Sequence, residues 1–129
     1  MGTRSLTFVY DENGKTPIIN LYRQYDGYME GHGRELAEFI TPFTIVNGIG
    51  SRTENIANGM GCLAAQLVAH FKDGVGQFYL HPTSAKDCGQ DYEYHVYKDK
   101  VVVKDYNGKV IFKGDWEAFF NACYEKEAA

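Results

Sequence analysis

The alternation of apolar and polar residues predicts β-strands near both ends of the chain and helices between them. Large apolar side chains alternate with smaller ones over residues 5–10, a period of two that is typical of a strand. The turn residues Asp-Glu-Asn-Gly follow at 11–14. A second strand is therefore expected over residues 17–25, as the other half of a hairpin.

A short helix and a long helix are predicted for the middle of the chain. Leu36, Phe39 and Ile40 share one face of the short helix, and Pro42 ends it. The long helix has the spacing of one apolar face, formed by Ile56, Met60, Leu63, Ala64, Leu67, Val68 and Phe71.

The long helix also has end signals and a second stripe. Ser51 and Glu54 match a capping box at its start, and Gly74 marks its end. Small residues recur at intervals of four on another face, at Ala57, Gly61, Ala65 and Ala69. Because small side chains let another backbone approach closely, we expect this helix to be buried on two sides. A homo-oligomer, either a dimer or a larger assembly, follows as an expectation.

The period returns to two in the last part of the chain. Four strands of an antiparallel meander are predicted over residues 77–81, 92–97, 100–106 and 109–113. Asn107-Gly108 is a hairpin signal, and Asp115 can cap a last helix. One face of that helix carries Trp116, Phe119, Phe120 and Cys123. The predicted order ββααββββα favours a single α+β domain over residues 1–129, with an antiparallel sheet and one long central helix.

Composition and charge narrow the class of partner. A hydrophobic fraction of 44% and a charged fraction of 23% are typical of a globular domain. A net charge of -4 argues against a grip on a nucleic acid polymer, which needs clustered Lys and Arg. Residues 1–6 carry neither an apolar signal core nor a myristoylation pattern, and the three cysteines form no C-x-x-C pair. We expect a cytoplasmic protein that does not associate with membranes and has no disulfide framework.

The glycine-rich turn before the long helix is the first candidate binding site. Gly50, Ser51, Arg52 and Thr53 lie where backbone N–H groups and the helix dipole attract phosphate or carboxylate. The turn lacks both the Gly-Lys-Ser/Thr of a P-loop and the layout of a dinucleotide fingerprint. An ordinary turn before a well-capped helix explains the same residues, so both interpretations stay open.

The second candidate is the segment of residues 22–34, which gathers tyrosines, two arginines and a histidine. Tyrosine and arginine offer stacking surfaces and bidentate donors for a base or a phosphate. Alternatively, the tyrosines are half-buried sheet residues and Arg23 pairs with Asp26 or Glu30. The candidate ligand-binding residues of this segment are Arg23, Tyr25, Asp26, Tyr28 and His32.

The strand over residues 77–81 is the third candidate. Its alternation places Phe78 and Leu80 on one face and Tyr79 and His81 on the other. At least one ring is then expected outside the main core, where a base could stack on it. Packing of both rings in the core is the alternative.

No catalytic or metal-binding pattern is readable in the sequence. Cys88 with His81 or His95 lacks the surroundings of a known nucleophile, and the four histidines lack metal-site spacing. Asp26 and Glu30 would form a carboxylate pair only if folding brings them to the right separation. We therefore expect binding without chemical transformation, and no cofactor or metal.

Part of the sequence resembles known proteins. Residues 1–6, 22–28 and 31–33 resemble a family of small phage and bacterial proteins. In length, strand order and glycine-rich turn, the chain is similar to the phage Thoeris anti-defence sponges. Those proteins bind cyclic ADP-ribose signals in a multimer and leave them intact.

The resemblance to the sponges implies ligand-binding roles for Arg52 near a helix start and for Phe78 on a later strand. The sponges also use an arginine in their C-terminal part, whereas no arginine follows Arg52 here. Lys109 or Lys113 would have to take its place.

The expected function is the sequestration of a cyclic nucleotide immune signal without cleavage, in the host cytoplasm if a phage encodes the protein. The signal would be a cyclic ADP-ribose isomer or a cyclic oligonucleotide. One alternative is a protein–protein interaction module that acts through a tyrosine-rich surface. The other is a small nucleotide-processing enzyme.

Overall fold

Two strands that are far apart in the sequence, Ser5–Tyr10 (β1) and Tyr92–Val96 (β6), pair in parallel at the centre of a six-stranded sheet. The structure, a computed structural model, describes the backbone of residues 2–46 and 56–128 and the side chains up to residue 124. The order of the strands across the sheet is β5-β2-β1-β6-β7-β8. Every other neighbouring pair in this sheet is antiparallel. The remaining strands are Pro17–Arg23 (β2), Phe78–His81 (β5), Val101–Asp105 (β7) and Val110–Gly114 (β8).

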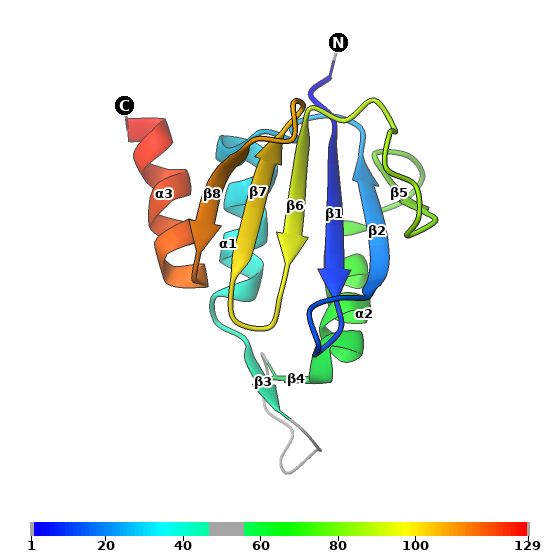
Figure 1. Cartoon of the computed structure of the whole chain (residues 1–129), viewed down its shortest axis with the longest axis vertical. Helices are drawn as coiled ribbons and strands as arrows, with labels where there is room; N and C mark the ends of the chain where they lie inside the picture. The colour runs from blue at the N-terminus through cyan, green and yellow to red at the C-terminus, as the bar shows by residue number, and fades with distance from the viewer. Residues whose placement is uncertain (1, 47–55, 129) are drawn as a thin grey trace.

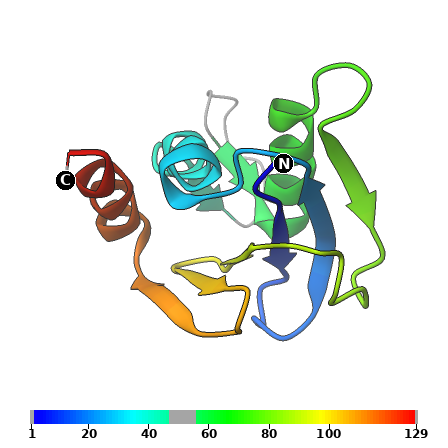
Figure 2. The same cartoon turned by 90° about the horizontal axis from the view of Figure 1, so that it is seen from above.

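Helices cover one face of this sheet (Figures 1 and 2). A π-helical turn, Met29–Gly33 (η1), leads into Arg34–Ile40 (α1), and Gly59–Phe71 (α2) lies beside α1 on the same face. The last helix, Trp116–Ala128 (α3), packs against α1 beyond the β8 edge. The loop that joins β5 to β6 passes over the ends of β2 and β1 (Figure 1).

The core lies between the sheet and the helices. Strand alternation turns Val9, Leu21 and Tyr94 toward the helices, where each is at most 2% exposed. From the helix side, Leu36 of α1 and Leu63 of α2 complete the same apolar cluster. The apolar stripe predicted for the long helix is thus its core-facing side.

Several local predictions are confirmed. The fold is α+β with a mostly antiparallel sheet. The 11–14 turn joins β1 to β2, and the Asn107-Gly108 turn joins β7 to β8 with Gly108 at φ +80°. Asp115 caps α3, since its Oδ1 accepts a hydrogen bond from the backbone N–H of Ala118 over 2.8 Å. The two turns and the helix cap depend only on residues that are neighbours in the sequence.

The predicted element order and the predicted strand pairing are each wrong, and α2 is not the one long helix, because α3 also has 13 residues. The long helix begins at Gly59, because Ile56–Asn58 (β4) is a short strand paired in parallel with Thr44–Val46 (β3). The expected meander also fails, because β5 pairs with β2, while β6 pairs with β1 and β7.

The stripe of small residues does not bury a second side of α2 within one chain. Ala57 lies in β4 and is buried, whereas Gly61, Ala65 and Ala69 are exposed. The expected homo-oligomer remains a prediction.

Candidate ligand-binding pocket

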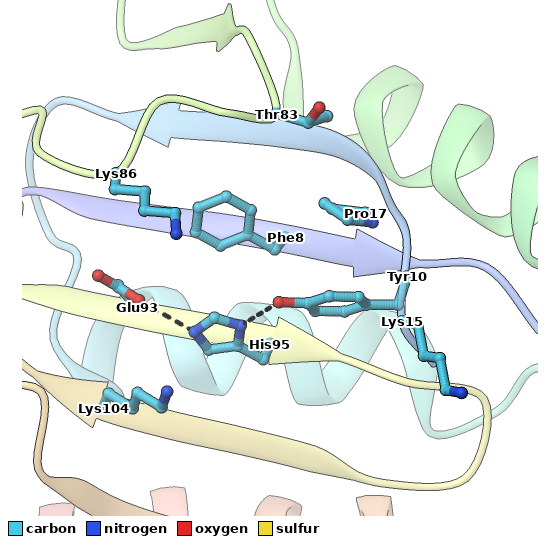
Figure 3. A pocket seen from close by; sticks show the side chains of 9 residues that line it. All are labelled: Phe8, Tyr10, Lys15, Pro17, Thr83, Lys86, Glu93, His95 and Lys104. Carbon is cyan, nitrogen blue, oxygen red and sulfur yellow. Dashed lines mark hydrogen bonds and ion pairs between the residues drawn. The ribbon is translucent and has the colours of Figure 1, made fainter. Parts of the chain in front are cut away.

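A pocket of about 360 Å³ lies on the sheet face that points away from α1 and α2 (Figure 3). Phe8 of β1 and His95 of β6 lie at its centre. Both side chains point to this face because they alternate with core residues on their strands. Three segments surround these rings: the β1–β2 hairpin, the loop from β5 to β6, and β7.

The rings in the pocket belong to a stacked column along the β1–β6 junction. Phe8 and His95 are direct partners in the parallel register, and their ring centroids are 5.2 Å apart with planes inclined by 12°. Tyr10 stacks on His95 at 5.7 Å and on Tyr97 at 4.6 Å. Stacking of this kind holds the rings rigidly in place and gives the pocket an aromatic floor.

A chain of hydrogen bonds fixes His95. Its Nε2 lies 3.0 Å from Glu93 Oε1, and its Nδ1 lies 2.7 Å from the Tyr10 hydroxyl. Because an ionised carboxylate only accepts, Nε2–H donates to Glu93, and in this tautomer Nδ1 can accept from Tyr10. The other Glu93 oxygen, Oε2, accepts from Gln90 Nε2 over 2.9 Å.

The electrostatics of this chain keep Glu93 ionised and Tyr10 protonated. The hydrogen bond from His95 lowers the pKa of Glu93, and the hydrogen bond from Gln90 and the charge of Lys104 act in the same direction. Burial raises the pKa of the Tyr10 hydroxyl, and neighbouring Tyr97 raises it further. Tyr10 therefore keeps its proton at neutral pH and is able to donate a hydrogen bond.

Three lysines surround the pocket. Lys15 comes from the β1–β2 hairpin, Lys86 from the loop after β5, and Lys104 from β7. Within the described part of the chain, the amines of Lys15 and Lys86 have neither an ion pair nor a hydrogen bond. The lining thus carries three ammonium groups and one carboxylate, a local positive excess in a chain of net charge -4. Such a lining attracts a small anion.

The chemistry of the pocket suits binding. Both ring nitrogens of His95 are engaged by protein groups, Nε2 by Glu93 and Nδ1 by Tyr10. The protonated Tyr10 is not a phenolate nucleophile. Phosphate near the lysines and a planar group against the aromatic floor match these properties.

The glycine-turn candidates Gly50, Ser51, Arg52 and Thr53 lie outside the described residues. The structure does describe the start of α2, where a carboxylate of this chain binds the backbone. Glu12 Oε2 accepts a hydrogen bond from the backbone N–H of Met60 over 2.6 Å. A phosphate at this helix end would compete with Glu12.

Phe78 is buried on the helix side of the sheet. It is 5% exposed, contacts Phe71 with a centroid distance of 5.4 Å, and lies 5.0 Å from the Arg23 guanidinium carbon. Tyr79 projects from the other face and is 46% exposed, as the predicted alternation requires. Lys109 precedes β8, at the sheet edge opposite to β5, so the structure does not bring Phe78 and Lys109 together.

Arg23 and His32 of the 22–34 segment belong to a buried network. Arg23 Nη1 lies 2.5 Å from Glu35 Oε2 and 3.2 Å from His32 Nδ1, and Arg23 Nε donates to the Tyr25 carbonyl. His32 Nε2 lies 2.7 Å from Thr7 Oγ1. Because arginine only donates, His32 Nδ1 is an acceptor and the ring is neutral. Burial, followed by the charge of Arg23, lowers the pKa of His32 to about 3.

This network attaches the 22–34 segment to the sheet. The partner of Arg23 is Glu35, so the expected pairing with Asp26 or Glu30 is wrong. Tyr25 and Asp26 are exposed, and the Tyr28 hydroxyl lies 3.4 Å from Asp26 Oδ1. Of the candidates in this segment, those two and the half-buried Tyr28 remain accessible.

Sequence reasoning missed the pocket. A period of two over residues 92–97 already places Glu93, His95 and Tyr97 on one face. The signal was incomplete because Phe8 and Tyr10 join that face only through the parallel β1–β6 pairing.

The described residues contain no group of three or more His, Cys, Asp or Glu side chains able to hold a metal ion. Among the helices of these same residues, none is long and apolar enough to cross a membrane. The chain matches no protein-family model, and neither a curated protein nor a solved structure shows significant similarity to it.

Proposed function

We propose that this chain binds a small phosphate-bearing nucleotide in the sheet-face pocket and holds it without chemical change. The observation that carries the proposal is the placement of Lys15, Lys86 and Lys104 around the stacked Phe8 and His95 rings. Ammonium groups bind phosphate, and an aromatic floor suits a purine or pyrimidine.

The biological role within this proposal is that of a sponge for a cyclic nucleotide immune signal. The resemblance to the phage Thoeris anti-defence sponges supports this role, with a cyclic ADP-ribose isomer or a cyclic oligonucleotide as the signal. The pocket supports the same class of ligand through its charge and its rings. Oligomerisation and a cytoplasmic location belong to this proposal as well.

The test is a depletion-and-release experiment. The protein is incubated with cyclic ADP-ribose isomers and with cyclic dinucleotides, and the free ligand is measured by mass spectrometry. The protein is then denatured by heat. We expect one class of ligand to be depleted and to return intact, whereas recovery of an altered nucleotide would favour a nucleotide-processing enzyme.

Lysine variants locate the site. The double variant Lys15→Gln/Lys86→Gln should weaken binding about tenfold or more, because charge-assisted hydrogen bonds are each worth roughly 1.5–3 kcal/mol. Lys109→Gln and Lys113→Gln, at exposed positions that do not line the pocket, serve as matched losses of charge. If they abolish binding while the double variant binds normally, the ligand does not occupy this pocket.

A second candidate function is protein–protein interaction, favoured by exposed apolar groups at the β5 edge. Val75, Tyr79 and Leu80 lie close together in the sequence there, and all three are exposed. Co-purification separates the two functions. A protein partner that is lost with Tyr79→Ala and retained in the Lys15→Gln/Lys86→Gln variant would support the interaction module.

A further inference from the structure

We infer that Glu93 is the specificity-determining residue of the sheet-face pocket, and that it accepts hydrogen bonds from the ribose hydroxyls of the ligand. The pocket then selects ribonucleotides over simple polyanions such as pyrophosphate. This inference rests on the proposed nucleotide-binding function and adds the ligand group that contacts the carboxylate.

A carboxylate is electrostatically unfavourable in a site that binds only phosphate. Glu93 lies in the same pocket as Lys15, Lys86 and Lys104, and its negative charge repels a phosphate bound near them. The carboxylate does not avoid this cost by taking up a proton. Hydrogen bonds from His95 and Gln90 hold it ionised, and the charge of Lys104 adds to their effect.

The geometry leaves Glu93 able to accept from a ligand. Its side chain is 25% exposed and lines the pocket. Each carboxylate oxygen accepts one hydrogen bond from the protein, Oε1 from His95 and Oε2 from Gln90. An ionised carboxylate has about four acceptor positions, so capacity for two further donors remains.

The surroundings of Glu93 fix it in one orientation. His95 is held in turn by the Tyr10 hydroxyl and by stacking on Phe8. A fixed acceptor beside an aromatic floor suits the hydroxyls of a ribose whose base lies on the rings. Recognition of ribose hydroxyls by an acidic side chain recurs in nucleotide sites. Simple polyanions bring no donor for Glu93 and meet only its repulsion.

Two probes with opposite expected responses test this inference. ADP and inorganic pyrophosphate are titrated calorimetrically into the wild-type chain, into Glu93→Gln, and into Glu117→Gln, which removes the same charge at an exposed position on α3. In Glu93→Gln we expect ADP to bind about tenfold more weakly and pyrophosphate about threefold more tightly. Glu117→Gln should bind both probes as the wild type does.

A measurement on the wild-type chain keeps the test independent of folding effects in the variant. ADP that lacks the 2′- and 3′-hydroxyls should bind the wild type about tenfold more weakly than ADP does. Glu93→Gln should not distinguish the two nucleotides.

The inference is overturned if Glu93→Gln strengthens ADP and pyrophosphate equally, or if the wild type binds ADP and its dideoxy form alike. Those results would leave the proposed nucleotide site standing, because ADP still binds. If the wild type binds neither ADP nor pyrophosphate, that result contradicts the proposed function itself. The inference then fails with it.

Discussion

The backbone N–H of Met60 donates a hydrogen bond of 2.6 Å to the carboxylate of Glu12. A residue at the tip of the first hairpin therefore caps the N-terminus of α2. The two residues are 48 positions apart. Acidic groups are favourable at a helix N-terminus because unpaired N–H groups and the helix dipole are located there. This contact joins the hairpin to the helix layer below it.

Glu12 should stabilise the fold at neutral pH and lose that effect in acid. The hydrogen bond from Met60 lowers the pKa of Glu12 below 4.5, so its stabilisation is present above that pH and disappears as the pH falls through the folded-state value. We expect Glu12→Gln to melt a few degrees lower than the wild type at pH 7, with the gap narrowing as the pH falls below 4.5. Thermal melts across this range check it, with Glu38→Gln as an exposed control on α1. A gap that does not depend on pH would contradict the role of the Glu12 charge.

Two glycines at the start of α2 should respond in opposite directions to alanine. Gly59 has φ +83°, and a Cβ there would lie 2.9 Å from Glu12 Oε2, whereas a Cβ on Gly61 would meet nothing within 4 Å. We expect Gly59→Ala to destabilise the protein by about 1 kcal/mol or more and Gly61→Ala to stabilise it by about 0.5–1 kcal/mol. Urea denaturation of both variants tests this. Equal effects would mean that Gly59 does not have this backbone conformation in solution.

The buried His32 should make the fold sensitive to acid. Its pKa falls from 6.5 to about 3 on folding, so below pH 6.5 the unfolded chain takes up a proton that the folded chain refuses. Stability should fall by about 1.4 kcal/mol per pH unit between these values because of this residue. In His32→Gln, which keeps a polar group beside Thr7, that part of the slope should vanish. Denaturant titrations at pH 7, 5.5 and 4 compare the slopes, and identical slopes would show that His32 titrates normally.

The hydroxyl of Tyr10 should fix the tautomer of His95. Tyr10→Phe removes the donor to Nδ1 and leaves the bond from Nε2 to Glu93, at a cost of about 1 kcal/mol in stability. Long-range ¹⁵N–¹H NMR spectra of the imidazole should show the Nε2–H tautomer in the wild type and a less uniform ring in the variant. A wild-type ring protonated at Nδ1 alone would contradict the assigned direction of both bonds.

The elements predicted correctly are those that neighbouring residues determine. The 11–14 and 107–108 turns, the cap at Asp115 and the core-facing stripe of α2 each follow from a few adjacent positions. The start of α2 did not follow in this way. Ser51 and Glu54 match a capping box, yet the group that caps the described helix start is Glu12, from another part of the chain.

The pocket could not be predicted from the sequence, for a related reason. Its central pair, Phe8 and His95, forms only because β1 and β6 are neighbours, and nothing in either strand's own sequence specifies that neighbour. For Arg23 and His32, the sequence could not distinguish a ligand-binding role from a structural one. Their side chains are as suitable for a buried hydrogen-bonded network as for a ligand, and only the fold shows that they point inward.

The parallel pairing of β1 with β6 also has a kinetic consequence. On the ribosome, the first hairpin would emerge with one edge of β1 unpaired until residues 92–96 had been synthesised. Sheet formation then depends on contacts of long sequence separation, which fold slowly compared with local ones. We expect one late, cooperative folding event, and an incomplete chain that attracts chaperones and proteases until β6 takes its place.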